Sequence, residues 1–175
     1  MQINIEECKF IPDCYCKSTL VLGCGNILFG DDGFGSTVAA SLKENYSTPN
    51  DSYILVAGTS VRDILFNIAL GGSKVKRIIL VDAVDFQHIG KIPGEIFELS
   101  IDEMPIIKID DFSMHQIPTS NLLKELRDYC KIDVKILACQ IKSIPEKVKV
   151  GLSKPVRQAV PKMCNKILET IQKET

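Results

Sequence analysis

The feature that most constrains the fold is the run Ile78–Val81, in which every residue is apolar. A strand that is apolar on both faces is typical of the centre of a parallel sheet covered by helices on both sides. Shorter strand patterns and helical apolar spacings alternate around it along the chain. They predict strands over 18–23, 53–56, 77–81, 94–99 and 134–138, and helices over 34–46, 60–70, 120–129 and 155–170.

This alternation predicts a single-domain α/β/α sandwich with a mostly parallel, twisted sheet of about five strands. The chain has 175 residues, which is enough for one domain with a sizeable core. We expect residues 18–175 to form that domain and residues 1–17 to form an N-terminal extension containing Cys8, Cys14 and Cys16. The alternating pattern of 94–99 indicates a strand with one solvent-facing side, at an edge of the sheet.

Composition excludes several classes of protein. No run of about 18 apolar residues occurs, which argues against a membrane span. A net charge of −1 gives no electrostatic reason to expect nucleic acid as a partner. The seven cysteines are odd in number and irregularly spaced, so they indicate reduced thiols and a cytoplasmic protein rather than a disulfide framework.

Three residues that bear functional groups fall at strand ends or in loops. Asp32 follows the first predicted strand across a turn, Asp82 directly follows the strand 77–81, and His115 lies in a later loop. The carboxyl ends of parallel strands meet at one edge of a sheet, where functional groups gather. Two carboxylates and one imidazole suit Ni²⁺, Zn²⁺, Mn²⁺ or Fe²⁺. The sequence therefore predicts a divalent-metal site made by these three residues.

Other interpretations of the same segments are weaker. The glycines around Cys24 suggest a dinucleotide-binding turn, but Leu28 stands where a small residue is needed and no acid ends the strand near Val56. Cys24 as a nucleophile with His115 as its base is a further alternative. Asp31 and Asp32 are adjacent, and one of them is a candidate for capping the helix that follows.

The string from Gly25 to Gly35, GNILFGDDGFG, resembles the opening motif of the nickel–iron hydrogenase maturation proteases. Two further family motifs follow in order, Val81-Asp82-Ala83 and Ser113-Met114-His115. The resemblance runs from about residue 18 to the C-terminus. The residues Cys24, Phe29 and Phe34 make the chain most similar to the subgroup that serves the deazaflavin-reducing hydrogenases of methanogens.

The resemblance implies a cytoplasmic, aspartyl-type endopeptidase connected with methanogenesis. It would remove the C-terminal extension of a hydrogenase large-subunit precursor after nickel insertion. It also implies a role for each of several residues. Asp32, Asp82 and His115 would be the metal ligands, Asp32 and Asp82 the catalytic groups, and Asn26, Asp31, Gly58 and Thr59 the substrate contacts.

The implied metal is nickel carried by the substrate, although another divalent cation fits the same ligand set. The implied partner is the large-subunit precursor, and the net charge and the lack of a long apolar run argue against nucleic acid and membrane as partners. Two routes to peptide cleavage stay open, namely a metal-polarised carbonyl with an activated water and general-base action by Asp31, Asp32 or Asp82. One departure is Ala57, which stands before Gly58-Thr59 where many members have an acid.

Three other classes of function compete with the protease. A metal-dependent small-molecule hydrolase would cleave esters or phosphates without a protein partner. A nucleotide-binding regulator would bind nucleotides saturably. A non-catalytic nickel chaperone would bind the large subunit and leave its C-terminus intact.

Overall fold

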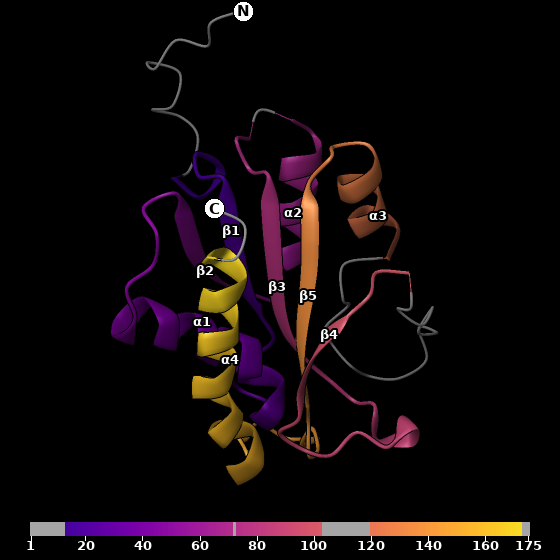
Figure 1. The fold of residues 1–175 in the computed structure, drawn as a ribbon. Helices are drawn as coiled ribbons and strands as arrows, with labels where there is room; N and C mark the ends of the chain where they lie inside the picture. Colours follow the sequence, from indigo (N-terminus) through magenta and orange to yellow (C-terminus); the bar gives the residue numbers. More distant parts are fainter. Residues whose placement is uncertain (1–12, 72, 103–119, 173–175) are drawn as a thin grey trace, which may run out of the picture.

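The structure is a computed structural model that describes residues 13–71, 73–102 and 120–172. Strands and helices alternate along most of the chain, in the predicted order (Figure 1). The strands are β1 (Thr19–Cys24), β2 (Ser52–Gly58), β3 (Arg77–Val84), β4 (Ile96–Leu99) and β5 (Asp133–Gln140). The helices are α1 (Phe34–Asn45), α2 (Val61–Ala69), α3 (Ser120–Asp128) and α4 (Lys154–Gln172), with short 3-10 turns η2 (Asp13–Tyr15), η3 (Gly30–Gly33) and η4 (Gln87–Ile89).

The five strands form one sheet in the order β2-β1-β3-β5-β4. β2, β1, β3 and β5 are parallel, and β4 runs antiparallel to β5 at the edge. This arrangement confirms the predicted mostly parallel sheet and the predicted edge position of 94–99. β3, the strand of the apolar run, lies in the middle of the sheet, as its two apolar faces require.

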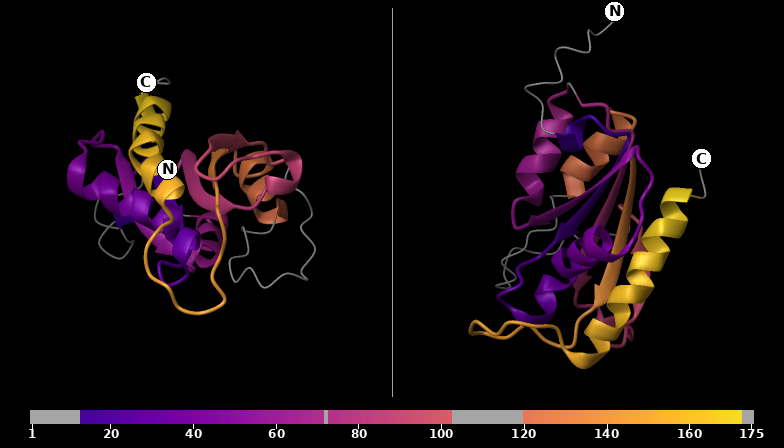
Figure 2. Two further views of the ribbon diagram at one scale, coloured as in Figure 1. Left: turned by 90° about the horizontal axis from the view of Figure 1, so that it is seen from below. Right: turned by 90° about the vertical axis from the view of Figure 1, so that its left-hand side faces the viewer.

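Helices cover both faces of the sheet, and each face has its own apolar core. α2 and α3 pack on one face around Leu65 and Leu123, whereas α1 and α4 pack on the other around Phe34 and Met163. Figure 2 shows α4 on one side of the sheet and α2 and α3 on the other. The α/β/α sandwich is therefore confirmed.

The strands of the sheet end at different heights. Gly23 of β1 pairs with Val81 of β3, and the β1–β3 ladder ends there. The ladder between β3 and β5 continues to the pair of Val84 and Gln140. Asp82 therefore lies inside β3 and not directly after it, which corrects the expectation from the sequence. The physical reason is that β5 continues to pair with β3 beyond the last pair between β1 and β3.

The N-terminal 3-10 turn packs against the domain. Cys14 is buried in the core on the α2 side, and the carbonyl of Tyr15 accepts a hydrogen bond from the Lys74 N–H at 2.7 Å. The division of the chain at residue 17 stays a prediction, and Cys8 lies outside the described residues. None of the helices in the described part of the chain is long and apolar enough to cross a membrane. The cytoplasmic location also stays a prediction.

Candidate active site

The turn between β1 and α1 is built on glycines. Gly25 has a φ of +96°, and a Cβ there would lie 1.8 Å from the carbonyl oxygen of Asp32. Only glycine allows both the backbone angle and this close approach. The Gly25 N–H donates to the Gly58 carbonyl at 3.1 Å, and the Ser36 hydroxyl donates to the Gly25 carbonyl at 2.7 Å. The turn is thereby fastened to the end of β2 and to the first turn of α1.

Asp32 is held in this turn at the carboxyl edge of the sheet. It lies in η3 and is only 3% exposed. Its Oδ2 accepts a hydrogen bond from the Asn26 N–H at 2.6 Å. The N-cap residue of α1 is Gly33, which has no side chain to accept a hydrogen bond from the helix. The alternative that Asp31 or Asp32 caps α1 is therefore wrong.

Asp82 reaches the same edge from the middle of the sheet. It is 5% exposed, and its Oδ1 accepts a hydrogen bond from the Ala83 N–H at 2.8 Å. The start of α1 packs directly on this end of β3, because a Cβ at Gly35 would lie 2.1 Å from the Val81 carbonyl oxygen. This close packing brings the turn that carries Asp32 to the part of β3 that carries Asp82.

The pKa of Cys24 indicates that both carboxylates lie near its thiol. Burial raises the pKa of Cys24 well above its usual value, and the charges of Asp82 and Asp32 raise it further. Both carboxylates therefore act on the same sulfur at the end of β1. A raised pKa keeps the thiol protonated, and a protonated thiol is a poor nucleophile. This electrostatic environment disfavours Cys24 as the catalytic residue.

Asp31 is adjacent to Asp32 in the sequence, but its carboxylate faces different partners. Its Oδ1 accepts a hydrogen bond from the Ser153 N–H at 2.6 Å. Its Oδ2 accepts from the Ser153 hydroxyl at 2.8 Å and from the Lys142 N–H at 2.9 Å. The side chain is 2% exposed. Asp31 thus joins η3 to the segment between β5 and α4, while its substrate contact stays a prediction.

The predicted substrate-contact residues other than Asp31 lie near the end of β2 and in the turn after β1. Asn26 and Gly58 lie at the same edge, joined through the hydrogen bond from Gly25 to Gly58, and the Asn26 Oδ1 accepts from the Leu28 N–H at 3.0 Å. Thr59 is exposed directly after β2.

His115, the third predicted metal ligand, lies outside the described residues. Within the residues that the structure describes, no cluster of three or more His, Cys, Asp and Glu side chains is placed to hold a metal. Asp32 and Asp82 are two buried carboxylates at this edge, and their role as metal ligands stays a prediction.

Sequence reasoning missed Gln140, which holds the chain as it leaves β3. It is fully buried at the end of β5. Its Oε1 accepts a hydrogen bond from the Phe86 N–H at 2.6 Å, and its Nε2 donates to Asp85 Oδ1 at 3.1 Å. The sequence pattern that could have identified it is an amide at the end of an apolar strand, because a buried amide requires hydrogen-bond partners. Gln140 thereby fixes the loop that follows Asp82.

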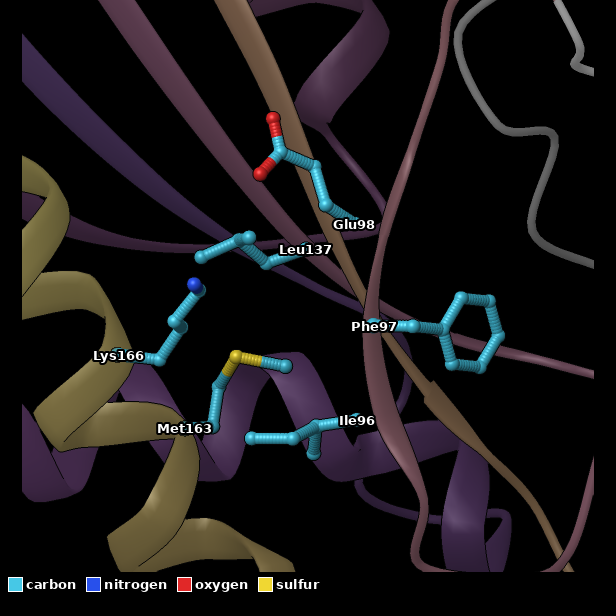
Figure 3. Close-up of a pocket in the computed structure, with 6 residues that line it drawn as sticks. All are labelled: Ile96, Phe97, Glu98, Leu137, Met163 and Lys166. Carbon is cyan, nitrogen blue, oxygen red and sulfur yellow. The ribbon is translucent and has the colours of Figure 1, made fainter.

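A cavity of about 270 Å³ lies between β4, β5 and α4. Figure 3 shows the side chains of Glu98 and Lys166 on the α4 side, with the Phe97 ring turned to the other side of β4. Neither Asp32 nor Asp82 is among the lining residues, so the cavity is separate from the carboxylate pair. The lining residues are Ile96, Phe97, Glu98, Leu137, Met163 and Lys166.

Comparisons with known proteins agree with this fold. The model of the HycI hydrogenase maturation protease family matches residues 36–170. A protein of Methanocaldococcus jannaschii assigned to the hydrogenase maturation proteases is 39% identical over 159 residues, which cover 90% of this chain and 98% of the relative. A protein of Methanothermobacter thermautotrophicus named coenzyme F420 hydrogenase subunit delta is 37% identical over 161 residues, covering 90% and 96%.

Solved structures show the same architecture. The crystal structure of a hydrogenase 3 maturation protease superimposes with a TM-score of 0.70 at 23% identity, covering 90% of this chain and 93% of that one. The hydrogenase maturating endopeptidase HybD from Escherichia coli superimposes with a TM-score of 0.67 at 26% identity, covering 89% and 92%. These structures confirm the fold class predicted from the sequence.

Proposed function

The chain belongs to the hydrogenase maturation protease family, and from this membership we propose that it removes the C-terminal extension of a nickel–iron hydrogenase large-subunit precursor once nickel has been inserted. The family assignment and its methanogen relatives confirm the resemblance found in the sequence. Family members are endopeptidases that act on hydrogenase precursors, so the chain is a hydrogenase maturation endopeptidase. The C-terminal cut and the dependence on nickel are the proposed part.

One observation carries the nickel part of the proposal. Asp32 and Asp82 are both buried, and both act on the Cys24 thiol at one edge of the sheet. Two carboxylates brought together away from water repel each other, and a divalent cation relieves that repulsion. A nickel ion carried by the precursor would supply the positive charge on binding. In this proposal His115 adds the imidazole ligand that nickel accepts.

Hydrolysis of the peptide bond needs a base close to the scissile carbonyl. Water adds to the carbonyl carbon, the C–N bond breaks, and the leaving amine takes up a proton. In this proposal Asp32 or Asp82 accepts the proton from water. A nickel-bound precursor would place its scissile bond beside them. The ion would thus distinguish nickel-loaded from nickel-free precursor and would also position the precursor for cleavage.

The decisive experiment compares nickel-loaded with nickel-free precursor. Each is incubated with the protein, and the products are weighed by mass spectrometry. A shortened large subunit in the nickel-loaded sample alone supports the proposal. Shortening of both samples removes the nickel-recognition role. Binding without shortening indicates a nickel chaperone, and hydrolysis of model esters or phosphates without a partner indicates a small-molecule hydrolase.

Variants connect the activity to the site. Asp82→Asn keeps the size of the side chain and removes its charge, and we expect it to lose nearly all processing of nickel-loaded precursor. Asp133→Asn, at the start of β5, is the matched control, because its exposed carboxylate pairs with Arg77 at the other end of the sheet. His115→Ala tests the third ligand in the same assay. A wild-type rate for Asp82→Asn contradicts the proposed role of the carboxylate pair.

A further inference from the structure

The segment between β5 and α4 is an exposed apolar loop at the same edge as Asp32 and Asp82. We call residues 142–151 the β5–α4 loop. Figure 2 shows it extending well beyond the ends of the strands. Large apolar side chains are exposed along it, with Val148 at 65% and Val150 at 69%, and Ile144 is exposed as well. A surface of this kind marks a site of protein interaction when its apolar side chains are contiguous.

Backbone pairing makes this surface continuous with the turn that carries Asp32. The Lys149 N–H donates to the Leu28 carbonyl at 2.9 Å, and the Gly30 N–H donates to the Lys149 carbonyl at 2.8 Å. Phe29 and Lys149 thus form an isolated parallel bridge. This bridge joins the backbone of Leu28 to the segment that carries Val148 and Val150. Leu28 is itself exposed, as is Ile27 before it.

Asp31 holds this surface in place. Its carboxylate accepts hydrogen bonds from Lys142, at the beginning of the loop, and from Ser153, just after its end. Both ends of the loop are therefore fixed to one buried side chain, which precedes Asp32 in the sequence. A surface that is ordered before binding loses less conformational entropy when a partner binds. The loop is thus built as a preformed surface at a fixed position relative to the site.

The charge of the loop indicates the chemistry of its partner. Lys142, Lys147 and Lys149 are exposed, and Glu146 is the one acidic residue among residues 142–151. An apolar surface with a positive rim complements a partner segment that has apolar side chains flanked by carboxylates. The loop adjoins the turn that carries Asp32, so the same partner would reach both.

We propose that the β5–α4 loop, together with Ile27 and Leu28, is a docking surface that binds an apolar, acidic segment of the hydrogenase precursor beside the scissile bond. This inference rests on the proposed function, since the precursor is the partner. The loop supplies binding energy, and Asp31 is a positioning residue that keeps the docking surface aligned with Asp32. The carboxylate pair performs the separate task of acting on the nickel-loaded end.

The test places a charge on the apolar surface. Val150→Asp is expected to raise the KM for nickel-loaded precursor about tenfold, as loss of a central interface side chain does, with little change in kcat. Leu70→Asp is the matched control, because Leu70 is 70% exposed but follows α2 at the other end of the sheet. Lys147→Glu should raise the KM for the precursor and make that KM less dependent on salt concentration. Val148→Asp provides a second apolar position, and thermal unfolding checks that each variant is folded.

Binding is measured separately from cleavage, so that the two proposals can fail independently. The dissociation constant of the precursor is determined with Asp82→Asn protein, with and without Val150→Asp. A tenfold weaker complex supports the docking surface even if the wild-type protein binds the precursor without shortening it. Normal KM and normal affinity for Val150→Asp and Val148→Asp overturn it, whether or not cleavage occurs. A wild-type protein that neither binds nor cleaves the precursor overturns both proposals.

The occupant of the surface is also tested directly. If the protein is a dimer in sedimentation experiments and Val150→Asp makes it monomeric, the surface belongs to a second copy of the chain and the docking proposal is wrong. Binding to anionic lipid vesicles that is lost in Val150→Asp, with precursor affinity unchanged, assigns the surface to a membrane and likewise overturns it.

Discussion

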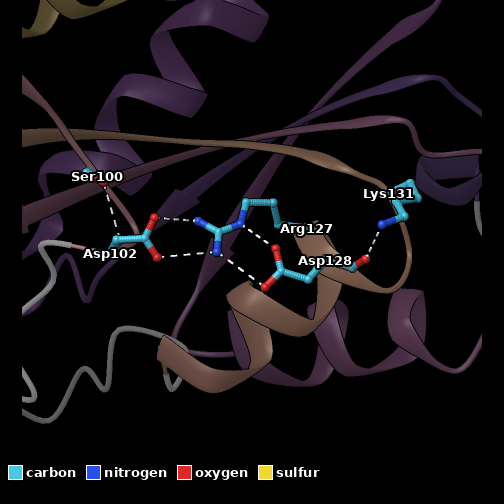
Figure 4. Close-up of polar contacts among 5 residues, drawn as sticks. All are labelled: Ser100, Asp102, Arg127, Asp128 and Lys131. Atoms are coloured by element: carbon cyan, nitrogen blue, oxygen red, sulfur yellow. Dashed lines mark hydrogen bonds and ion pairs between the residues drawn. The ribbon is translucent and has the colours of Figure 1, made fainter.

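The two ends of the sheet treat carboxylates in opposite ways. At the amino end, Asp133 pairs with Arg77, and Asp102 and Asp128 pair with Arg127 in solvent-exposed contacts (Figure 4). At the carboxyl end, Asp31 and Asp32 are buried and accept hydrogen bonds from the backbone N–H groups of Ser153, Lys142 and Asn26. The carboxylates at the amino end are exposed to water, whereas those at the carboxyl end are buried and held by backbone hydrogen bonds.

The two ends of the sheet therefore stabilise their carboxylates by different means. An exposed ion pair contributes little to stability, because water screens it and two long side chains must be ordered. A buried carboxylate is costly unless donors hold it, and each donor must in turn be positioned by the fold. The carboxyl end therefore depends on close backbone packing, such as that at Gly25 and Gly35. Substitutions at the two ends should differ accordingly.

The largest effect is expected at Gly35, where the first turn of α1 touches the end of β3. A Cβ there would lie 2.1 Å from the Val81 carbonyl oxygen and 2.6 Å from that of Cys24. Gly35→Ala should lower the free energy of unfolding by about 3 kcal/mol, as overpacking against a fixed backbone does, and should abolish processing. Urea denaturation measures the loss.

The control for this substitution is Gly71→Ala. Gly71 has a φ of +94°, and a Cβ there would meet no atom within 4 Å in the described part of the chain, so alanine encounters backbone strain alone. Its expected cost is about 1 kcal/mol. Equal losses for the two variants would show that the carboxyl end is not the more tightly constrained region.

The second effect concerns thiols at the two ends. Burial raises the pKa of Cys139 to about 12, burial and the charges of Asp82 and Asp32 raise the pKa of Cys24, and Cys130 is exposed at the amino end. A raised pKa leaves less thiolate at pH 8, and thiolate is the reactive form. Iodoacetamide should therefore modify Cys130 roughly a hundredfold faster than Cys24 or Cys139, as peptide mass spectrometry would show. Rapid modification of Cys24 in folded protein would revive its interpretation as a nucleophile.

The third effect compares two aspartates, one from each end. Asp31→Ala removes the acceptor for the Ser153 and Lys142 N–H groups and should destabilise the protein by about 2 kcal/mol. Asp133→Ala removes one exposed ion pair and should cost about 0.5 kcal/mol. Both values come from urea denaturation under the same conditions. A larger loss for Asp133→Ala would reverse the comparison.

The sequence predicted the architecture because the architecture is local and periodic. Each strand is an apolar run and each helix an apolar stripe, and alternation of the two leaves few topologies. The edge strand was also predictable, since 94–99 alternates in polarity. The end of β3 was not, because the position of Asp82 inside the strand depends on how far β5 continues to pair beyond β1.

For the candidate site, the sequence predicted the shared edge of its carboxylates but not their hydrogen-bond partners. Asp32 and Asp82 meet at one edge, as their places along the chain suggested. Asp31 and Asp32 are adjacent, and nothing near them in the sequence shows which one faces the site. The carboxylate of Asp31 is held by Ser153, which lies 122 residues away in the sequence and reaches it only through the fold. A partner so distant leaves no local pattern to interpret.

The smallest effect is expected for Arg127→Ala at the amino end. Arg127 donates to Asp128 Oδ1 at 2.7 Å and to Asp102 Oδ2 at 2.9 Å, and the contact with Arg127 lowers the pKa of Asp128. A lowered pKa contributes stability above the unfolded-state pKa of about 4, and this contribution is lost as the pH falls through the folded-state value. The variant should therefore lower the Tm only slightly at pH 7 in low salt. The difference from wild type should shrink between about pH 5 and pH 3, and also in roughly 1 M NaCl.

Arg127→Lys sharpens this last prediction, because it keeps the charge but loses the planar fork that contacts both carboxylates. Its Tm should lie between those of wild type and Arg127→Ala at pH 7 in low salt. A Tm loss for Arg127→Ala that is as large as the loss for Asp31→Ala, and that persists at pH 3 and in high salt, would mean that Arg127 acts through packing instead of charge. The amino end would then also be built into the fold, and the contrast between the two ends would fail.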